Sequence, residues 1–175
     1  KFSDHKDADG AIVCLPTPTI NGKCNDNSIV DLLEELGSNI PVLLKSTVTP
    51  DLLEEYPSNV TYNPEFLRAS TASEDWNDQK YFILGGDAQG CKFWKTVFSY
   101  LDVSFFETDK KTASMVKYVH NTWLATKVAF FHEIYSNLGE SYNHANMSQL
   151  LGLFENIGPS HMTAPNNEGK LGYGG

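Results

Sequence analysis

The sequence predicts an α/β fold in which a parallel sheet with flanking helices is followed by a long central helix and a further helical region. Over the first 108 residues, short continuous apolar runs alternate with segments of helical period, which is typical of a parallel sheet built by crossover connections. From residue 109 to 137 there is no Pro or Gly, and the apolar residues keep a helical period. We therefore expect an α/β domain over 1–108 and a central helical region over 109–175.

Five short apolar runs predict the strands of the sheet. Pro16 stops the first run, and the Gly85-Gly86 pair ends the fourth. Continuous apolar runs of this length are typical of strands that are buried on both faces of a parallel sheet. The runs are 11–15, 41–45, 60–62, 81–84 and 103–106.

Helical periodicity predicts helices between and after these strands. Asn27 or Ser28 can cap the first helix, Gly37 can end it, and Pro50 suits the first turn of the second. The fourth helix would be about 40 Å long at 1.5 Å per residue, which suits a projecting or interface-forming helix. The predicted helices are 28–36, a short one that opens at Thr49-Pro50, 87–101, 109–137 and 143–153.

Composition excludes several classes of protein. The 175 residues include 13 Lys and Arg against 22 Asp and Glu, a formal net charge of −9, so nucleic acid and anionic membranes are not the expected partners. No apolar run approaches the roughly 20 residues of a membrane-spanning helix, and the first residues lack the apolar core of a signal peptide. Cys14, Cys24 and Cys91 have no metal-ligand spacing, which favours reduced thiols. We expect a cytoplasmic protein without a bound metal.

Three polar segments each follow a predicted strand, at 16–19, 46–48 and 63–68. Ligands of open parallel sheets bind outside the carboxyl ends of the strands, so these segments would line one crevice. Each segment alone could be an ordinary turn, because Thr, Pro, Asn and Ser are common turn residues. Three in succession favour a binding crevice.

Three residues carry chemistry that suits catalysis. Lys117 and Asn121 are four apart on the long predicted helix, so they share a face from which they could donate hydrogen bonds to an oxyanion. Glu65 could act as a general base. The alternatives are a solvated helix face for Lys117 and Asn121, and simple exposure for a loop glutamate.

Five sequence segments occur in a characteristic order. They are P-T-P-T at 16–19, K-S-T-V at 45–48, N-P-E-F-L-R at 63–68, K-Y-V-H-N-T at 117–122 and G-Y-G-G at 172–175. In this order and approximate spacing they resemble the UDP-glucose/GDP-mannose dehydrogenase family. I-G-P-S-H-M at 157–162 is similar to the UDP-glucose branch of that family. The resemblance covers nearly the whole chain.

The resemblance implies an NAD-dependent oxidoreductase that oxidises UDP-glucose to UDP-glucuronate in two steps, through a cysteine adduct. It implies a partial Rossmann-like NAD-binding domain over 1–108, and a homodimer paired through 109–137. Glu65 would be the acid/base residue, Lys117 and Asn121 would steady the oxyanion, and Thr47 would help to hold the hydrolytic water. The implied NAD contacts are Thr17, Pro18, Thr19, Ser46, Thr47 and Val48. The implied substrate contacts are Glu65, Phe66, Leu67, Arg68, Lys117, Asn121, His161, Gly172, Tyr173 and Gly174.

The resemblance also predicts departures from the family. The first βαβ unit with its G-x-G-x-x-G turn would precede residue 1, and the catalytic cysteine would follow Gly175. We therefore expect the isolated chain to be inactive and to bind NAD weakly. Ala69 stands where the family commonly has a second Glu, and Asn156 where it often has Arg. The rival hypotheses are a non-catalytic α/β oligomerisation module and a different nucleotide-binding α/β protein.

Overall fold

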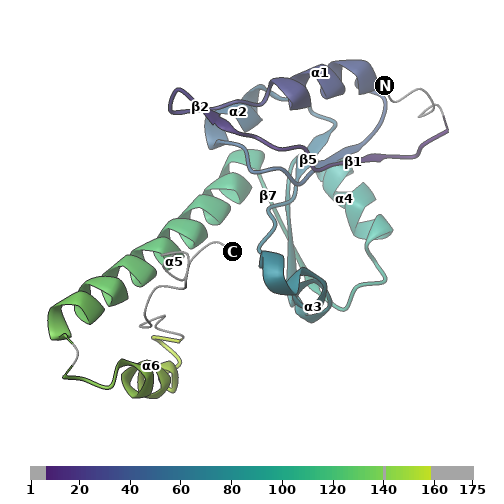
Figure 1. Cartoon of the computed structure of the whole chain (residues 1–175). Coiled ribbons are helices and arrows are strands. Elements are labelled where there is room, and N and C mark those ends of the chain that lie inside the picture. Colours follow the sequence, from purple (N-terminus) through teal and green to yellow (C-terminus); the bar gives the residue numbers. More distant parts are fainter. Residues whose placement is uncertain (1–6, 140, 159–175) are drawn as a thin grey trace. The chain divides into compact units, whose positions relative to one another are not determined.

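The computed structural model describes residues 7–139 and 141–158, which form two compact units (Figure 1). The first unit comprises 7–67 and 73–118, and the second comprises 68–72 and 119–158. The long helix α5 (Lys110–Leu138) contributes its first turns to the first unit and the remainder to the second.

The first unit is built on a five-stranded sheet with the strand order β1-β4-β5-β6-β7. The neighbours β1, β4 and β5 are parallel to one another, and β6 is parallel to β7. The mainly parallel α/β architecture that the sequence predicts is therefore confirmed. The strands are β1 (Ala11–Val13), β4 (Val42–Leu44), β5 (Val60–Tyr62), β6 (Tyr81–Gly85) and β7 (Ser104–Thr108).

One strand pair differs from the prediction, because β6 runs antiparallel to β5. The two strands meet at the single pair Tyr62–Gly85, so most of β6 extends past the carboxyl end of β5. A parallel pair needs a crossover that carries the chain back along the sheet. The connection from 63 to 80 instead holds only a 3₁₀ turn (Ala69–Thr71) and the short helix α3 (Ala72–Asp78) before β6 begins beyond the end of β5. The polar sequence of α3 lacks an apolar stripe, so this helix was not predicted.

Helices cover both faces of the sheet and enclose two apolar clusters. Val42 and Leu44 of β4 pack with α1 (Asn27–Leu36) and α2 (Pro50–Glu55), while Leu43 packs with α4 (Ala88–Val97) on the other face. All three residues of β4 are fully buried, which explains the continuous apolar run in its sequence. A side chain at Gly90 would collide with Thr61, so this glycine allows α4 to lie directly on β5.

A two-stranded hairpin, which the apolar runs do not predict, follows β1. Its strands are β2 (Thr19–Ile20) and β3 (Lys23–Cys24), joined by Asn21 at φ 52° and Gly22 at φ 76°. Positive φ at both central positions is the geometry that Asn-Gly favours in a two-residue hairpin. The Asn-Gly pair was therefore the signal that could have revealed it.

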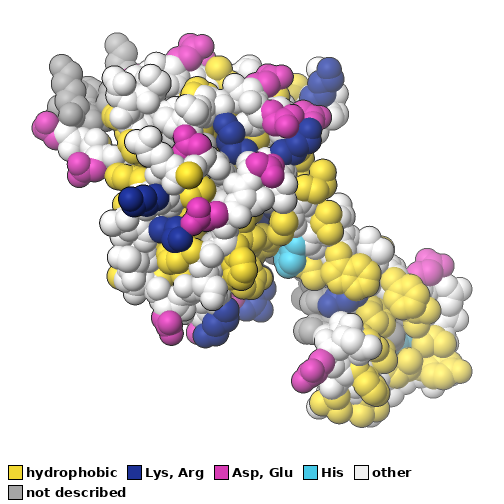
Figure 2. All heavy atoms as spheres, turned by 180° about the vertical axis from the view of Figure 1, so that it is seen from behind, with side chains coloured by type: hydrophobic (Ala, Val, Ile, Leu, Met, Phe, Trp, Pro, Cys, Tyr) yellow, Lys and Arg dark blue, Asp and Glu magenta, His cyan; other side chains and the backbone are white. Residues whose placement is uncertain are grey.

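The helical prediction for the later part of the chain is confirmed. Asp109 caps α5 by accepting hydrogen bonds from the backbone N and the hydroxyl of Thr112, at 2.7 and 2.6 Å, and these bonds hold the pKa of Asp109 below its ordinary value. The helix α6 (His144–Gly152) follows. Hydrophobic side chains gather over α5 and α6 (Figure 2), where Val119, Trp123 and Phe130 of α5 are 58 to 60% exposed. Within 7–139 and 141–158, no helix is both long and apolar enough to span a membrane.

Candidate functional site

The three polar segments singled out in the sequence come together at the carboxyl ends of β1, β4 and β5. The Thr17 hydroxyl donates a hydrogen bond of 2.7 Å to the carbonyl oxygen of Thr47, which joins the segment after β1 to the segment after β4. The backbone N of Asn63 donates to the carbonyl oxygen of Leu44 at 2.9 Å, so the segment after β5 begins beside β4. The parallel pairing of these strands therefore places all three segments at one edge of the sheet.

The residues predicted to contact NAD differ in the solvent exposure of their side chains. Thr17 is half-buried, while Pro18, Thr19 and Thr47 are exposed. Ser46 is 7% exposed, and its hydroxyl has no hydrogen-bond partner in the part of the chain that the structure describes. The Val48 side chain is fully buried in the core, and its carbonyl oxygen accepts a hydrogen bond of 2.7 Å from the Ser114 hydroxyl. Ser46 is thus the residue of this set whose buried hydroxyl lacks a hydrogen-bond partner among the described residues.

The predicted acid/base residue and the predicted lysine lie against each other. Lys117 is 8% exposed, and its Nζ donates a hydrogen bond to the carbonyl oxygen of Glu65 and lies 3.9 Å from Glu65 Oε2. The other carboxylate oxygen, Glu65 Oε1, accepts a hydrogen bond of 2.5 Å from the backbone N of Leu67. The burial of Lys117 contradicts the solvated-face alternative for this residue.

Burial decides the electrostatics of this pair. Desolvation lowers the pKa of Lys117, and the Glu65 carboxylate opposes that shift without cancelling it. The Phe66 ring lies 5.3 Å from Lys117 Nζ, in a cation–π arrangement that gives the ammonium an apolar neighbour. Lys117 is therefore a desolvated hydrogen-bond donor beside a carboxylate.

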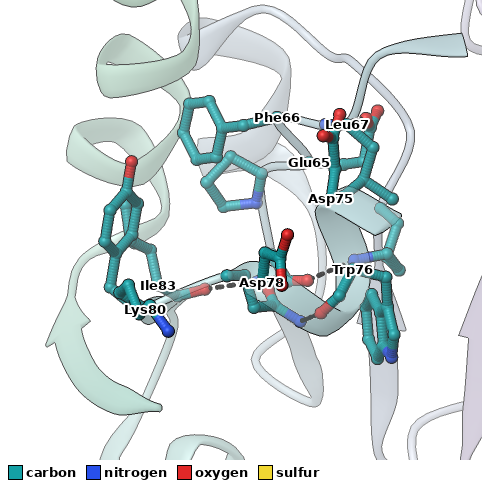
Figure 3. A pocket seen from close by; sticks show the side chains of 13 residues that line it. Glu65, Phe66, Leu67, Asp75, Trp76, Asp78, Lys80 and Ile83 are labelled. Carbon is teal, nitrogen blue, oxygen red and sulfur yellow. Dashed lines mark hydrogen bonds between the residues drawn. The ribbon is translucent and has the colours of Figure 1, made fainter. Parts of the chain in front are cut away.

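A cavity of about 240 Å³ opens beside Glu65 (Figure 3). The segment from Glu65 to Leu67 forms one part of its wall, and α3 contributes Trp76 and Asp78. The lining combines aromatic rings with carboxylates, which can accept hydrogen bonds from the hydroxyl groups of a polar ligand.

Lys45 and Asn63 line this cavity and were not among the predicted catalytic, cofactor or substrate contacts, although they belong to the segments 45–48 and 63–68 singled out in the sequence. Lys45 Nζ donates a hydrogen bond to Asn63 Oδ1, and Asn63 Nδ2 donates to the carbonyl oxygen of Ile83 at 2.7 Å. Lys45 Nζ also lies 5.6 Å from the ring centroids of Trp76 and Phe82. Burial lowers the pKa of Lys45, Lys117 lowers it further, and Cys14 and Glu65 oppose the shift. The sequence signal that could have revealed Lys45 as a site residue is its charge, directly after a fully buried strand.

Two further predicted site residues, Asn121 and Arg68, belong to the second unit. Asn121 follows Lys117 by one turn of α5, is half-buried, and has its Oδ1 3.2 Å from His120 Nδ1 in the second unit. Arg68 is exposed at the start of the 3₁₀ turn. No group of three or more His, Cys, Asp or Glu suited to a metal ion occurs within the described ranges. The predicted substrate contacts that lie outside the described residues are His161, Gly172, Tyr173 and Gly174.

Known proteins resemble the chain over most of its length. No model of a protein family matches it. It is 28% identical to the UDP-glucose 6-dehydrogenase of Rickettsia typhi over 182 residues, which is 93% of this chain and 42% of that protein. It is 30% identical to the GDP-mannose 6-dehydrogenase of Azotobacter vinelandii over 148 residues, which is 71% of this chain and 34% of that protein.

Solved structures agree with these relatives. The UDP-glucose dehydrogenase of Pyrobaculum islandicum superposes with a TM-score of 0.74 at 25% identity, covering 87% of this chain and 40% of that one. The GDP-mannose dehydrogenase of Pseudomonas aeruginosa gives a TM-score of 0.64 at 28% identity, covering 71% and 34%.

These comparisons confirm the resemblance seen in the sequence, and they also limit it. The chain spans less than half the length of each of these relatives. Its homologues and its structural neighbours are nucleotide-sugar dehydrogenases, and the chain corresponds to a segment of them.

Proposed function

We propose that the chain is a segment of an NAD-dependent enzyme that oxidises UDP-glucose to UDP-glucuronate, with Glu65 and Lys117 among the reacting groups. The observation that carries the proposal is a buried lysine paired with a loop glutamate at the carboxyl edge of a parallel sheet, in a chain whose relatives are nucleotide-sugar dehydrogenases. Burying an ammonium costs free energy, so a purely structural module gains little from it. This favours an enzyme over a non-catalytic oligomerisation module.

The segments after β1 and β4 fit the proposed cofactor. When bound, NAD would supply the acceptor for the hydride that leaves the sugar alcohol. The Ser46 hydroxyl has no hydrogen-bond partner among the described residues, and we propose that a polar group of the cofactor becomes its partner. Thr17, Pro18, Thr19 and Thr47 would contact the cofactor from the neighbouring loops, while Val48 would act through its backbone.

The chemistry assigned to Lys117 and Glu65 follows from their surroundings. A desolvated ammonium stabilises an oxyanion more strongly than a hydrated one, because the local dielectric constant is lower. The Glu65 carboxylate lies at the cavity wall, where it can accept a proton from a sugar hydroxyl or a water molecule. We propose that Asn121, one turn along α5, supplies a second donor to the oxyanion, and that Phe66, Leu67 and Arg68 contact the sugar nucleotide.

A graft tests this function directly. This chain would replace the matching segment of the Rickettsia typhi UDP-glucose 6-dehydrogenase, and NADH formation would be followed by absorbance with UDP-glucose, GDP-mannose or UDP-N-acetylmannosamine. We expect turnover with UDP-glucose above the other two. A graft that folds cooperatively but oxidises none of the three would contradict the proposal, and turnover restricted to another sugar nucleotide would contradict the substrate.

A further inference from the structure

We propose that Phe66 is a positioning residue that covers the Lys117 ammonium and keeps water from it, and that Tyr81 of β6 holds the Phe66 ring in place. The functional meaning of this cover rests on the proposed function, in which Lys117 donates to an oxyanion. Phe66 lies in the loop after β5, Tyr81 is the first residue of β6, and Lys117 lies on α5. All three residues belong to the first unit.

The Lys117 ammonium contacts the loop that carries Phe66. Its Nζ donates to the carbonyl oxygen of Glu65 and lies 3.9 Å from Glu65 Oε2, while the centroid of the Phe66 ring is 5.3 Å away. Only 8% of the Lys117 surface is exposed. The Phe66 ring, which also borders the cavity in Figure 3, therefore adds an apolar cover to an ammonium that Glu65 already holds.

The Phe66 ring packs against the sheet through Tyr81. Phe66 is half-buried in a loop, so its ring needs a neighbour that fixes its orientation. The ring centroids of Phe66 and Tyr81 are 6.3 Å apart and their planes meet at 68°, an edge-to-face arrangement that aromatic pairs favour. Tyr81 pairs with Ser104 in the parallel ladder between β6 and β7. The Phe66 ring therefore rests on a side chain whose backbone is fixed by the sheet.

The antiparallel pairing of β6 with β5 explains why Tyr81 reaches this loop. Gly85 pairs with Tyr62, and Tyr81 is four residues earlier in β6, so at about 3.3 Å per residue it lies roughly 13 Å beyond the carboxyl end of β5. The same part of β6 carries Ile83, whose carbonyl oxygen accepts the hydrogen bond of 2.7 Å from Asn63 Nδ2. A hydrogen bond and a ring contact thus join the loop after β5 to β6.

A covered ammonium keeps its hydrogen-bond donors available for a ligand. Water would hydrate the N–H groups of Lys117 and compete for them, whereas an aromatic ring attracts the charge and accepts hydrogen bonds only weakly. The pKa of Lys117, which burial lowers and Glu65 opposes, agrees with this exclusion of water. An oxyanion that reaches Lys117 would then meet a donor that does not first have to lose bound water.

The test measures how closely a dissolved probe approaches Lys117 in the chain itself, without ligand. Lysine labelled with carbon-13 beside the amine gives an NMR signal for each lysine, and a neutral gadolinium chelate in solution relaxes each signal more strongly the more exposed its carbon is. Lys117→Arg assigns the Lys117 signal. We expect Phe66→Ala to raise the relaxation of Lys117 toward that of the exposed Lys92, because the cover is removed. Phe106→Ala removes a 58% exposed ring from β7, and this matched control should leave Lys117 unchanged.

Tyr81 supplies a second variant pair. Its side chain is 49% exposed, so its loss should leave the sheet folded. Tyr81→Ala should raise the relaxation of Lys117, whereas Tyr81→Phe keeps the ring and should stay at the parent value. Lys110, in the first turn of α5, reports on general loosening of the first unit and should keep its parent value in every variant.

An unchanged Lys117 relaxation in a folded Phe66→Ala variant would overturn the proposal, and an equal rise at Lys110 would overturn it too, since the change would then be general. Should Phe66→Ala fail to fold, Tyr81→Ala decides in its place, and an unchanged Lys117 signal there would contradict the role of Tyr81 as well. Because the measurement involves no substrate, its outcome is independent of the graft experiment, and the two proposals can fail separately.

Discussion

Asn63 offers the sharpest prediction about what holds the site together. Its amide accepts a hydrogen bond from the Lys45 ammonium and donates one to the carbonyl oxygen of Ile83, and its side chain is almost completely buried. Asn63→Ala removes both bonds and leaves an ammonium and a carbonyl oxygen without their partner. Losing these two hydrogen bonds should therefore also destabilise the loop that carries Glu65.

The magnitude follows from the two bonds. A neutral hydrogen bond contributes about 0.5–1.5 kcal/mol to stability, and one to a charged group about 1.5–3 kcal/mol. Lys45 is only half-buried, so water entering the cavity would compensate part of the charged bond. We expect Asn63→Ala to lower the free energy of unfolding by about 2–4 kcal/mol, a large fraction of the 5–15 kcal/mol typical of a domain.

Urea unfolding followed by tryptophan fluorescence measures this loss, because Trp76 and Trp94 both lie in the first unit. The exposed Asn39→Ala is the matched control and should change the free energy of unfolding by less than about 0.5 kcal/mol. If Asn63→Ala lost as little stability as Asn39→Ala, the buried amide would contribute nothing, and the role assigned to its two hydrogen bonds would be wrong.

Three further predictions concern assembly, cofactor binding and pH. The exposed Val119, Trp123 and Phe130 of α5 predict a homodimer at micromolar concentration in sedimentation velocity, and a monomer there would contradict the proposed pairing. Without a G-x-G-x-x-G turn in its sequence, the chain should bind NAD no tighter than the millimolar range in isothermal titration, and a micromolar constant would show that the cofactor site is misplaced. Burial lowers the pKa of Lys110, whose Nζ donates to the carbonyl oxygens of Tyr56 and Pro57. As pH rises from the folded-state pKa of Lys110 to its ordinary 10.5, the unfolded chain therefore binds more protons, and the parent should gain stability relative to Lys110→Met. A stability difference that is constant over that range would contradict this assignment.

The sheet and its helices were predictable because their signals are local. A strand such as β4 must be apolar throughout when both of its faces are covered. The helix α5 is predicted by a long helical period without Pro or Gly. The order of the polar segments after β1, β4 and β5 then places them at one edge, since parallel strands share their carboxyl side.

The missed features depend on contacts distant in sequence. The antiparallel pairing of β6 with β5 depends on how residues 63–80 fold beyond the end of β5. Hydrophobic periodicity carries no information about that fold. From the sequence alone, Lys45 cannot be told from an ordinary polar residue at the end of a strand. Its hydrogen bond joins it to Asn63, which is 18 positions away. Burial of Lys117 likewise requires the Glu65 loop and the Phe66 ring, and helical spacing alone could not separate it from a solvated face.

We propose that Lys117 stabilises charge in the transition state of sugar-nucleotide oxidation. In the graft described above, Lys117→Ala would be compared with the exposed control Lys92→Ala by steady-state kinetics with UDP-glucose. We expect Lys117→Ala to lower kcat on the order of 100-fold or more while KM changes little, as for other oxyanion donors, and we expect the control to stay close to the parent. A folded Lys117→Ala graft whose kcat remains within a few-fold of the parent would contradict the claim.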